Sequence, residues 1–126
     1  MVDRQIQKRN RGNKRRGASF ELDLVKYLRS KGYDAERQSK TGKRDEGDVS
    51  ISTAWGAVVV EAKNVQRMDL PSFLRQAAIE AQHFEENRGW DGDTRNAEPV
   101  VIIKRRQAEI GQSYVVMTLD QYLSSL

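Results

Sequence analysis

A chain of 126 residues with 37% hydrophobic side chains is long enough to form one domain with its own buried core. It contains no cysteine, which excludes disulfide frameworks, thiol nucleophiles and zinc sites with cysteine ligands. No apolar run approaches the roughly 20 residues that cross a bilayer, and no apolar segment follows the charged N-terminus as it does in a secretory signal. We therefore expect an intracellular, cytoplasmic protein.

The net charge of +4 is unevenly distributed along the chain. Residues 1–16 hold seven basic side chains against Asp3, a net +6, so the remainder carries −2. A basic arm ahead of an acidic body is typical of proteins that contact a polyanion, because binding to phosphates releases counterions, although a solvated tail has the same composition. Residues 1–16 also lack hydrophobic periodicity. We predict a flexible basic arm there, followed by a single domain over residues 17–126.

The first predicted element of this domain is an amphipathic helix over residues 18–31. Its apolar side chains recur at four-residue steps and a glycine can end it, as shown by Phe20, Leu24, Leu28 and Gly32. Glu21 lies at the edge of the apolar stripe, one turn before Val25. We therefore expect Glu21 to face the interior side of the helix.

The rest of the chain alternates between strand and helix patterns. Strands are predicted near residues 33–38, 48–52, 57–63, 100–103 and 114–117, with helices at residues 69–88 and from residue 118. Pro71 suits the first turn of the middle helix, and Thr118 with Gln121 has the spacing of a capping box. We expect the last helix to cover the sheet with Leu119, Tyr122, Leu123 and Leu126. This order predicts a mixed sheet with helices packed on it, an α/β or α+β layer arrangement.

Residues 58–64, Val-Val-Val-Glu-Ala-Lys-Asn, end a hydrophobic strand with two opposite charges. Side chains alternate along a strand, so Glu61 and Lys63 share a face and Ala62 lies opposite. A strand end that emerges into water would carry the same pair, which then stabilises by only about 0 to 1 kcal/mol. Asp48 favours a different interpretation, because a hairpin through Trp55 and Gly56 brings it near Glu61.

Glu21 would add a third carboxylate if the first helix packs beside these strands. At about 4 Å and an effective dielectric near 20, each carboxylate pair repels by roughly 4 kcal/mol, so convergence of the three requires a cation. Ligation by oxygen atoms alone is what Mg²⁺ and Mn²⁺ prefer. Such a site suits phosphodiester hydrolysis, because a bound metal activates water and stabilises the leaving oxyanion. Lys63 would hold the attacking water or the phosphate.

These residues resemble the PD-(D/E)xK nuclease superfamily, with Gly47-Asp48 in place of the usual Pro-Asp and Glu61-Ala62-Lys63 as the second half of the motif. Within it, the sequence is most similar to archaeal-type and phage Holliday junction resolvases. This likeness rests on Arg16-Gly17-Ala18-Ser19-Phe20-Glu21, Thr41-Gly42, Gly47-Asp48 and Val60-Glu61-Ala62-Lys63, and covers roughly residues 17–103. It implies a restriction-endonuclease-like core, a central mixed five-stranded sheet flanked by helices.

The resemblance also implies an activity and residue roles. The activity is that of a Mg²⁺- or Mn²⁺-dependent DNA endonuclease that resolves four-way junctions by paired nicks, and hence acts as a homodimer. The implied metal ligands and catalytic residues are Glu21, Asp48, Glu61 and the carbonyl of Ala62, with Lys63 as the catalytic cation and Thr41 in the place of a loop serine. Gln76 matches a glutamine often found near such sites, although a solvated helix position would carry the same residue.

Basic residues next to the acidic ones in the sequence are candidates for binding the DNA backbone: Arg15, Arg16, Arg37, Lys40, Lys43 and Arg44. Lys104, Arg105 and Arg106 form a second basic cluster to which the sequence assigns no role, and His83 is interpreted as a surface residue. Two alternatives stay open. One is a related nuclease that acts on flaps, forks or duplex DNA, and the other is a non-catalytic DNA-binding module with solvated carboxylates.

Overall fold

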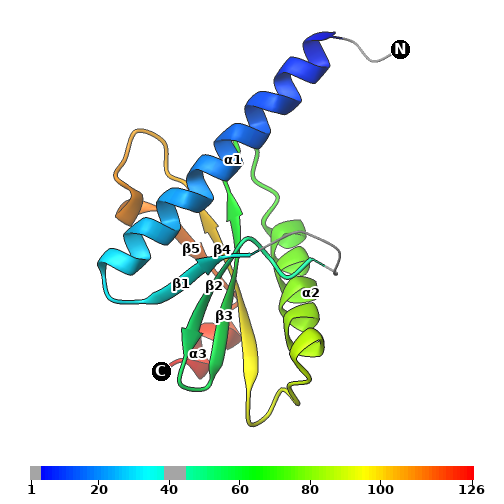
Figure 1. Ribbon diagram of the computed structural model, residues 1–126, viewed down its shortest axis with the longest axis vertical. Helices are drawn as coiled ribbons and strands as arrows, with labels where there is room; N and C mark the ends of the chain where they lie inside the picture. Colours follow the sequence, from blue (N-terminus) through cyan, green and yellow to red (C-terminus); the bar gives the residue numbers. More distant parts are fainter. Residues whose placement is uncertain (1–3, 39–44) are drawn as a thin grey trace.

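The computed structural model describes the backbone of residues 4–38 and 45–126, and the side chains of these ranges from Arg15 onward. A five-stranded sheet in the order β1-β2-β3-β4-β5 is flanked by α1 and α2 (Figure 1). Strands β3 and β4 are parallel, and the other neighbouring pairs are antiparallel. The predicted mixed sheet flanked by helices is thereby confirmed. Its elements are α1 (Arg4–Ser30), β1 (Asp34–Arg37), β2 (Val49–Thr53), β3 (Gly56–Lys63), α2 (Leu70–Arg88), β4 (Asn96–Ile103), a 3-10 helix (Ile110–Gln112), β5 (Tyr114–Val116) and α3 (Leu119–Ser124).

The two faces of the sheet are covered by different helices. The apolar stripe of α1 packs on one face, in a cluster that includes Phe20, Leu24, Val49, Val60 and Ile102. On the other face, α2 packs against the sheet in two clusters that include Ala77, Ala81, Phe84, Val59 and Val101. Because side chains alternate along β3, Val60 and Ala62 point toward α1, whereas Val59, Glu61 and Lys63 point toward α2. Glu61 and Lys63 therefore share a face with Ala62 opposite, as predicted.

Helix α1 begins earlier than the sequence pattern indicated. A flexible arm was predicted through residue 16, whereas the helix continues back to Arg4. Arg, Lys and Gln, which fill much of this segment, are good helix formers, and adding turns to a helix that is already nucleated costs little. Helix α1 is long but polar, and no helix in the described ranges is apolar enough over a sufficient length to span a bilayer.

The predicted helix ends are largely confirmed, but the predicted packing of α3 is wrong. Asp69 caps α2 by accepting a hydrogen bond from the Ser72 amide, and Thr118 caps α3 by accepting one from the Gln121 amide. Helix α3 has six residues, fewer than two turns, and turns Gln121 toward the sheet, where its Nε2 donates to the carbonyl of Pro99. Its apolar side chains consequently face outward, with Leu119 70% exposed and Tyr122 and Leu123 about half exposed, and Leu126, beyond the helix, is 82% exposed.

Candidate active site

The hairpin of β2 and β3 places Asp48 beside Glu61. Thr53 pairs with Gly56 and Val49 with Val60, which confirms the hairpin predicted from Trp55 and Gly56. The Asp48 amide donates to the carbonyl of Val60 at 2.9 Å, so the ladder extends one residue beyond β2. The Asp48 Oδ2 accepts from the Ala62 amide, also at 2.9 Å. The carboxylate of Asp48 is therefore held against the end of β3, next to the peptide that carries Glu61.

Gly47 allows this close approach. Its φ is +91°, and a Cβ there would lie 2.8 Å from Val59 Cγ1 and 3.2 Å from the Val60 carbonyl oxygen. A side chain at position 47 would therefore collide with β3. A proline is excluded as well, because its ring holds φ near −65°. This explains in physical terms why the usual Pro-Asp of the motif is Gly-Asp in this chain.

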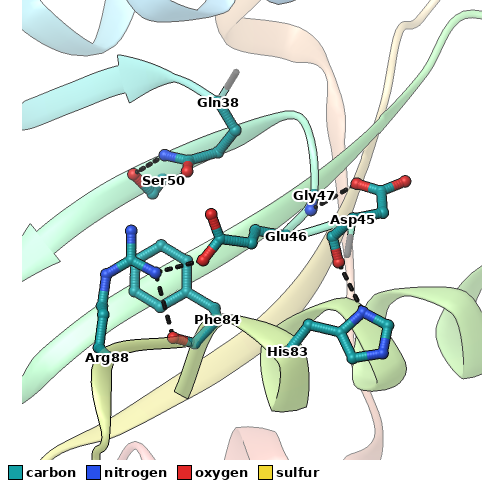
Figure 2. A network of polar contacts seen from close by, with 8 residues as sticks. All are labelled: Gln38, Asp45, Glu46, Gly47, Ser50, His83, Phe84 and Arg88. Atoms are coloured by element: carbon teal, nitrogen blue, oxygen red, sulfur yellow. Dashed lines mark hydrogen bonds and ion pairs between the residues drawn. The ribbon is translucent and has the colours of Figure 1, made fainter. Parts of the chain in front are cut away.

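The segment that precedes Asp48 is fastened to α2, as Figure 2 shows. The Asp45 carbonyl lies 2.8 Å from Nδ1 of His83, and Glu46 forms an ion pair with Arg88. Arg88 also lies over the ring of Phe84, 3.3 Å from its centroid. His83 is half-buried and holds this segment, which is a more specific role than the surface position that the sequence suggested. Helix α2 thus holds residues 45 and 46 in place, and these residues position Asp48 beside β3.

Lys63 is held by three neighbours on the α2 face of the sheet. Its Nζ lies 3.1 Å from Oε1 of Glu61 and donates to Oε1 of Gln76 at 3.0 Å. It also lies 4.9 Å from the ring centroid of Phe73, close enough for a cation–π contact. Gln76 is therefore a partner of the predicted catalytic lysine rather than an unrelated solvated residue.

Glu80 is a site residue that was not predicted from the sequence. It comes from α2, is 2% exposed, and interacts with the carboxyl group of Glu61. Burial raises the pKa of Glu80 to about 10, and the hydrogen bond to Glu61 and the charges of Glu61, Asp45 and Asp48 add to the rise. Burial also raises the pKa of Glu61, while a hydrogen bond from Glu80 and the ammonium of Lys63 oppose that rise. In the described part of the chain, no donor reaches Oε2 of Glu61 or either carboxyl oxygen of Glu80 if both groups are ionised. If Glu80 is protonated, its carboxyl group donates a hydrogen bond to Glu61, and two buried negative charges no longer face each other.

A signal for Glu80 exists in the sequence. The buried residues of α2 include Ala77, Ala81 and Phe84, and Glu80 lies within that stripe. A charged residue on the apolar stripe of a helix has to be paired or neutralised, because burial of an isolated charge is costly. The four-residue step from Gln76 to Glu80 places both side chains along the same side of α2, toward Lys63 and Glu61.

Comparison with known families identifies the family to which this chain belongs. A family described as "Phage putative PDDEXK endonuclease" matches residues 12–126. The chain belongs to this family. Asp48, Glu61 and Lys63 are the residues that the sequence predicts for the acidic and basic positions of the PDDEXK pattern. Nucleases of this superfamily generally use divalent metals.

A solved structure was also found to be similar, the Holliday junction resolvase Hjc of the archaeal hyperthermophile Archaeoglobus fulgidus. It is 16% identical in sequence, the match covers 86% of this chain and 88% of that one, and the TM-score is 0.46. No curated protein sequence matched the chain.

The predicted convergence of three carboxylates is not observed among the described side chains. Among the residues whose side chains are described, no three acidic or histidine side chains are arranged to hold a metal ion. Glu21 is buried on the α1 face of the sheet, where its Oε2 lies 3.4 Å from a guanidinium nitrogen of Arg37. Arg37 shares that face with Ala35, whereas Glu61 points toward α2. Glu21 and Glu61 therefore approach the end of the sheet from opposite sides.

The other predicted site residues are only partly described. Arg15 and Arg16 are exposed on α1, and the Arg16 carbonyl oxygen lies 3.4 Å from Nδ2 of Asn64, just beyond β3. The basic end of α1 thus lies near the carboxyl end of the active-site strand. Thr41, Lys40, Lys43 and Arg44 lie outside the described residues.

The donor set on the α2 face fits a hard divalent cation. Asp48 and Glu61 offer carboxylate oxygens at the end of β3, and apart from the carboxyl group of Glu80 no donor among the described residues reaches Oε2 of Glu61. Mg²⁺ keeps several water ligands and is usually held in proteins by one or two carboxylates, so two such side chains and a peptide carbonyl suffice. The oxygen-only chemistry of these residues also agrees with the absence of cysteine.

Proposed function

We propose that this protein is a metal-dependent DNA endonuclease that hydrolyses phosphodiester bonds at the end of β3. The proposal rests chiefly on one observation, the arrangement of Asp48, Glu61 and Lys63 in a chain of the PDDEXK family. Asp48 and Glu61 lie side by side, and Lys63 is bound to both Glu61 and Gln76. A solvated strand end would not bury Glu61 and Asp48 as deeply as the 5% and 6% exposure found here.

In this proposal, Asp48, Glu61 and the carbonyl of Ala62 hold Mg²⁺ or Mn²⁺. The bound ion would supply a hydroxide from its water and stabilise the leaving oxygen. Lys63 has three N–H donors, of which Glu61 and Gln76 take two. The third can donate to the attacking water or to a phosphate oxygen. Glu21 and Thr41 remain ligand and catalytic candidates on the basis of the resemblance alone.

Four-way DNA junctions are the proposed substrate, on the strength of the sequence similarity to junction resolvases in the segments around Glu21 and Asp48. Two symmetric nicks require two active sites, so we propose a homodimer that acts on DNA inside the cell. Arg15 and Arg16 support DNA binding near the site, because both are exposed on α1 and the Arg16 carbonyl oxygen lies 3.4 Å from Nδ2 of Asn64.

The test compares cleavage of a labelled four-way junction and a linear duplex by wild type, Asp48→Asn and Lys63→Ala, with Mg²⁺, with Mn²⁺ and with EDTA. In Asp48→Asn the new side-chain carbonyl still accepts the hydrogen bond from the Ala62 amide, so the fold should survive. Asp93→Asn, in an exposed loop, is the matched control. We expect both active-site variants to lose cleavage and keep DNA binding, while Asp93→Asn behaves as wild type.

The remaining alternatives give different results in the same assay. Preference for linear duplex in direct competition would assign the enzyme to another DNA structure. Absence of cleavage by the wild type with either metal would favour a non-catalytic DNA-binding module. A monomeric mass in solution and on the junction would contradict the paired-nick mechanism.

A further inference from the structure

A basic groove lies at the carboxyl ends of the two parallel strands. It has a volume of about 510 Å³ and lies between the β3–α2 connection, the segment after β4 and the start of β5. The basic groove is lined by Val65, Gln66, Met68, Lys104, Arg105, Arg106 and Tyr114.

The basic groove begins directly beside the active-site lysine. Lys63 and Ile103 are paired in the parallel ladder, and the Lys104 amide donates to the carbonyl of Lys63 at 2.9 Å. Because β3 and β4 run in the same direction, the segments that come after them leave the sheet at the same edge. A DNA strand with one phosphate at Lys63 can therefore continue into the basic groove.

The cations of the basic groove have no acidic partners in the described structure, unlike other cations around the site. The paired ones are Lys63 with Glu61, Arg37 with Glu21, and Arg88 with Glu46. Lys104, Arg105 and Arg106 are all exposed, and the described residues provide no ion pair or side-chain hydrogen bond for them. Three adjacent positive charges repel one another, and a polyanion relieves that repulsion.

The lining of the basic groove is also partly apolar. Met68 and Tyr114 are each 50% exposed, and Val65 is 38% exposed. A free phosphate or an acidic peptide makes little use of such surface, whereas a nucleic acid strand presents phosphates together with sugars and base faces. Stacking on an exposed aromatic ring is one of the common ways in which proteins bind unpaired bases.

We propose that the basic groove holds one DNA strand next to the bond that is cut, with phosphates on Arg105 and Arg106 and a sugar or unpaired base against Tyr114. This inference rests on the proposed function, since it takes Lys63 as the point where the scissile phosphate binds. It assigns the Lys104–Arg106 cluster to positioning of the substrate and not to the hydrolytic step.

The test measures DNA affinity of the full chain in EDTA as a function of salt, by fluorescence anisotropy with a labelled four-way junction. The variant is Arg105→Ala with Arg106→Ala. The matched control, Lys31→Ala with Arg95→Ala, removes the same charge from the end of α1 and from the opposite end of β4. Since the slope of log K against log salt changes by about 0.9 per phosphate contact, we expect a slope smaller by about 1.8 for the groove variant. At ~0.1 M salt this corresponds to roughly sixtyfold weaker binding, and the control should retain the wild-type slope.

Equal slopes for the groove variant, the control and the wild type would overturn the inference. Tyr114→Leu tests the apolar part separately. It should weaken binding to DNA with unpaired bases by roughly fivefold or more at an unchanged slope, and equal affinity would show that Tyr114 does not stack. Failure of the wild type to cleave DNA with any metal would count against the proposed function instead, while the slopes would still show whether the groove binds DNA.

Discussion

Replacement of Glu80 by glutamine should stabilise the metal-free protein at neutral and alkaline pH. The pKa of Glu80 is raised from 4.5 to about 10 in the folded protein, so above pH 4.5 the folded state keeps a proton that the unfolded chain releases. The contribution of Glu80 to stability is therefore greatest below pH 4.5 and is lost as the pH rises toward 10. At 1.36 kcal/mol per pH unit between pH 4.5 and pH 7, the raised pKa of Glu80 lowers the free energy of unfolding by at most about 3 kcal/mol. Glutamine has no proton to lose, and its amide can still donate to Glu61.

The measurement is urea unfolding of wild type and Glu80→Gln in EDTA at several pH values between 5 and 8. We expect nearly equal free energies of unfolding at pH 5 and a growing advantage for Glu80→Gln as the pH rises. Glu109→Gln, at an exposed position before the 3-10 helix, is the control and should behave as the wild type does. Parallel curves for wild type and Glu80→Gln across this range would show that Glu80 is ionised in the folded state and would refute the reasoning.

The contacts around the site support three more predictions. Gln76→Ala removes a hydrogen bond to a charged lysine and should slow cleavage by roughly tenfold in single-turnover assays, with DNA affinity unchanged. Arg88→Ala loses an ion pair and a ring contact and should lower the free energy of unfolding by about 1 to 2 kcal/mol in urea. Glu21→Gln should weaken Mn²⁺ binding less than Glu61→Gln does, because Arg37 holds Glu21 on the α1 face. Calorimetry measures both affinities, and an equal loss of affinity would show that Glu21 is a metal ligand.

Local patterns in the sequence predicted the elements and one half of the site. The four-residue steps of Phe20 and Leu24 correctly identified the buried side of α1, and alternation along β3 correctly placed Glu61 and Lys63 on one face. The tight turn through Trp55 and Gly56 fixed the hairpin register and thereby the position of Asp48. These features depend on contacts between neighbours in sequence or across one turn, which is why periodicity and turn chemistry were sufficient.

Positions that depend on which face of the sheet a helix covers were not predictable in this way. Glu21 lies at the edge of an apolar stripe, and that pattern is the same whether α1 packs on the face of Glu61 or on the opposite one. The outward orientation of Leu119 and Leu123 has a similar origin, because the sequence pattern of α3 does not show that Gln121 turns toward the sheet. The extra turns of α1 arise from helix propensity without burial, which a search for amphipathic periodicity does not detect.

The structure makes α2 as important for the site as the two strands that carry the motif. His83 and Arg88 fasten the segment that presents Asp48, while Gln76 positions Lys63 from the other end of the helix. Glu80 lies between them and places a buried carboxyl group against Glu61. Contacts from α2 therefore reach the segment before Asp48, the carboxyl group of Glu61 and the ammonium of Lys63. The geometry of the candidate site depends on this helix, although none of its residues belongs to the Asp and Glu-Ala-Lys pattern by which the site was predicted from the sequence.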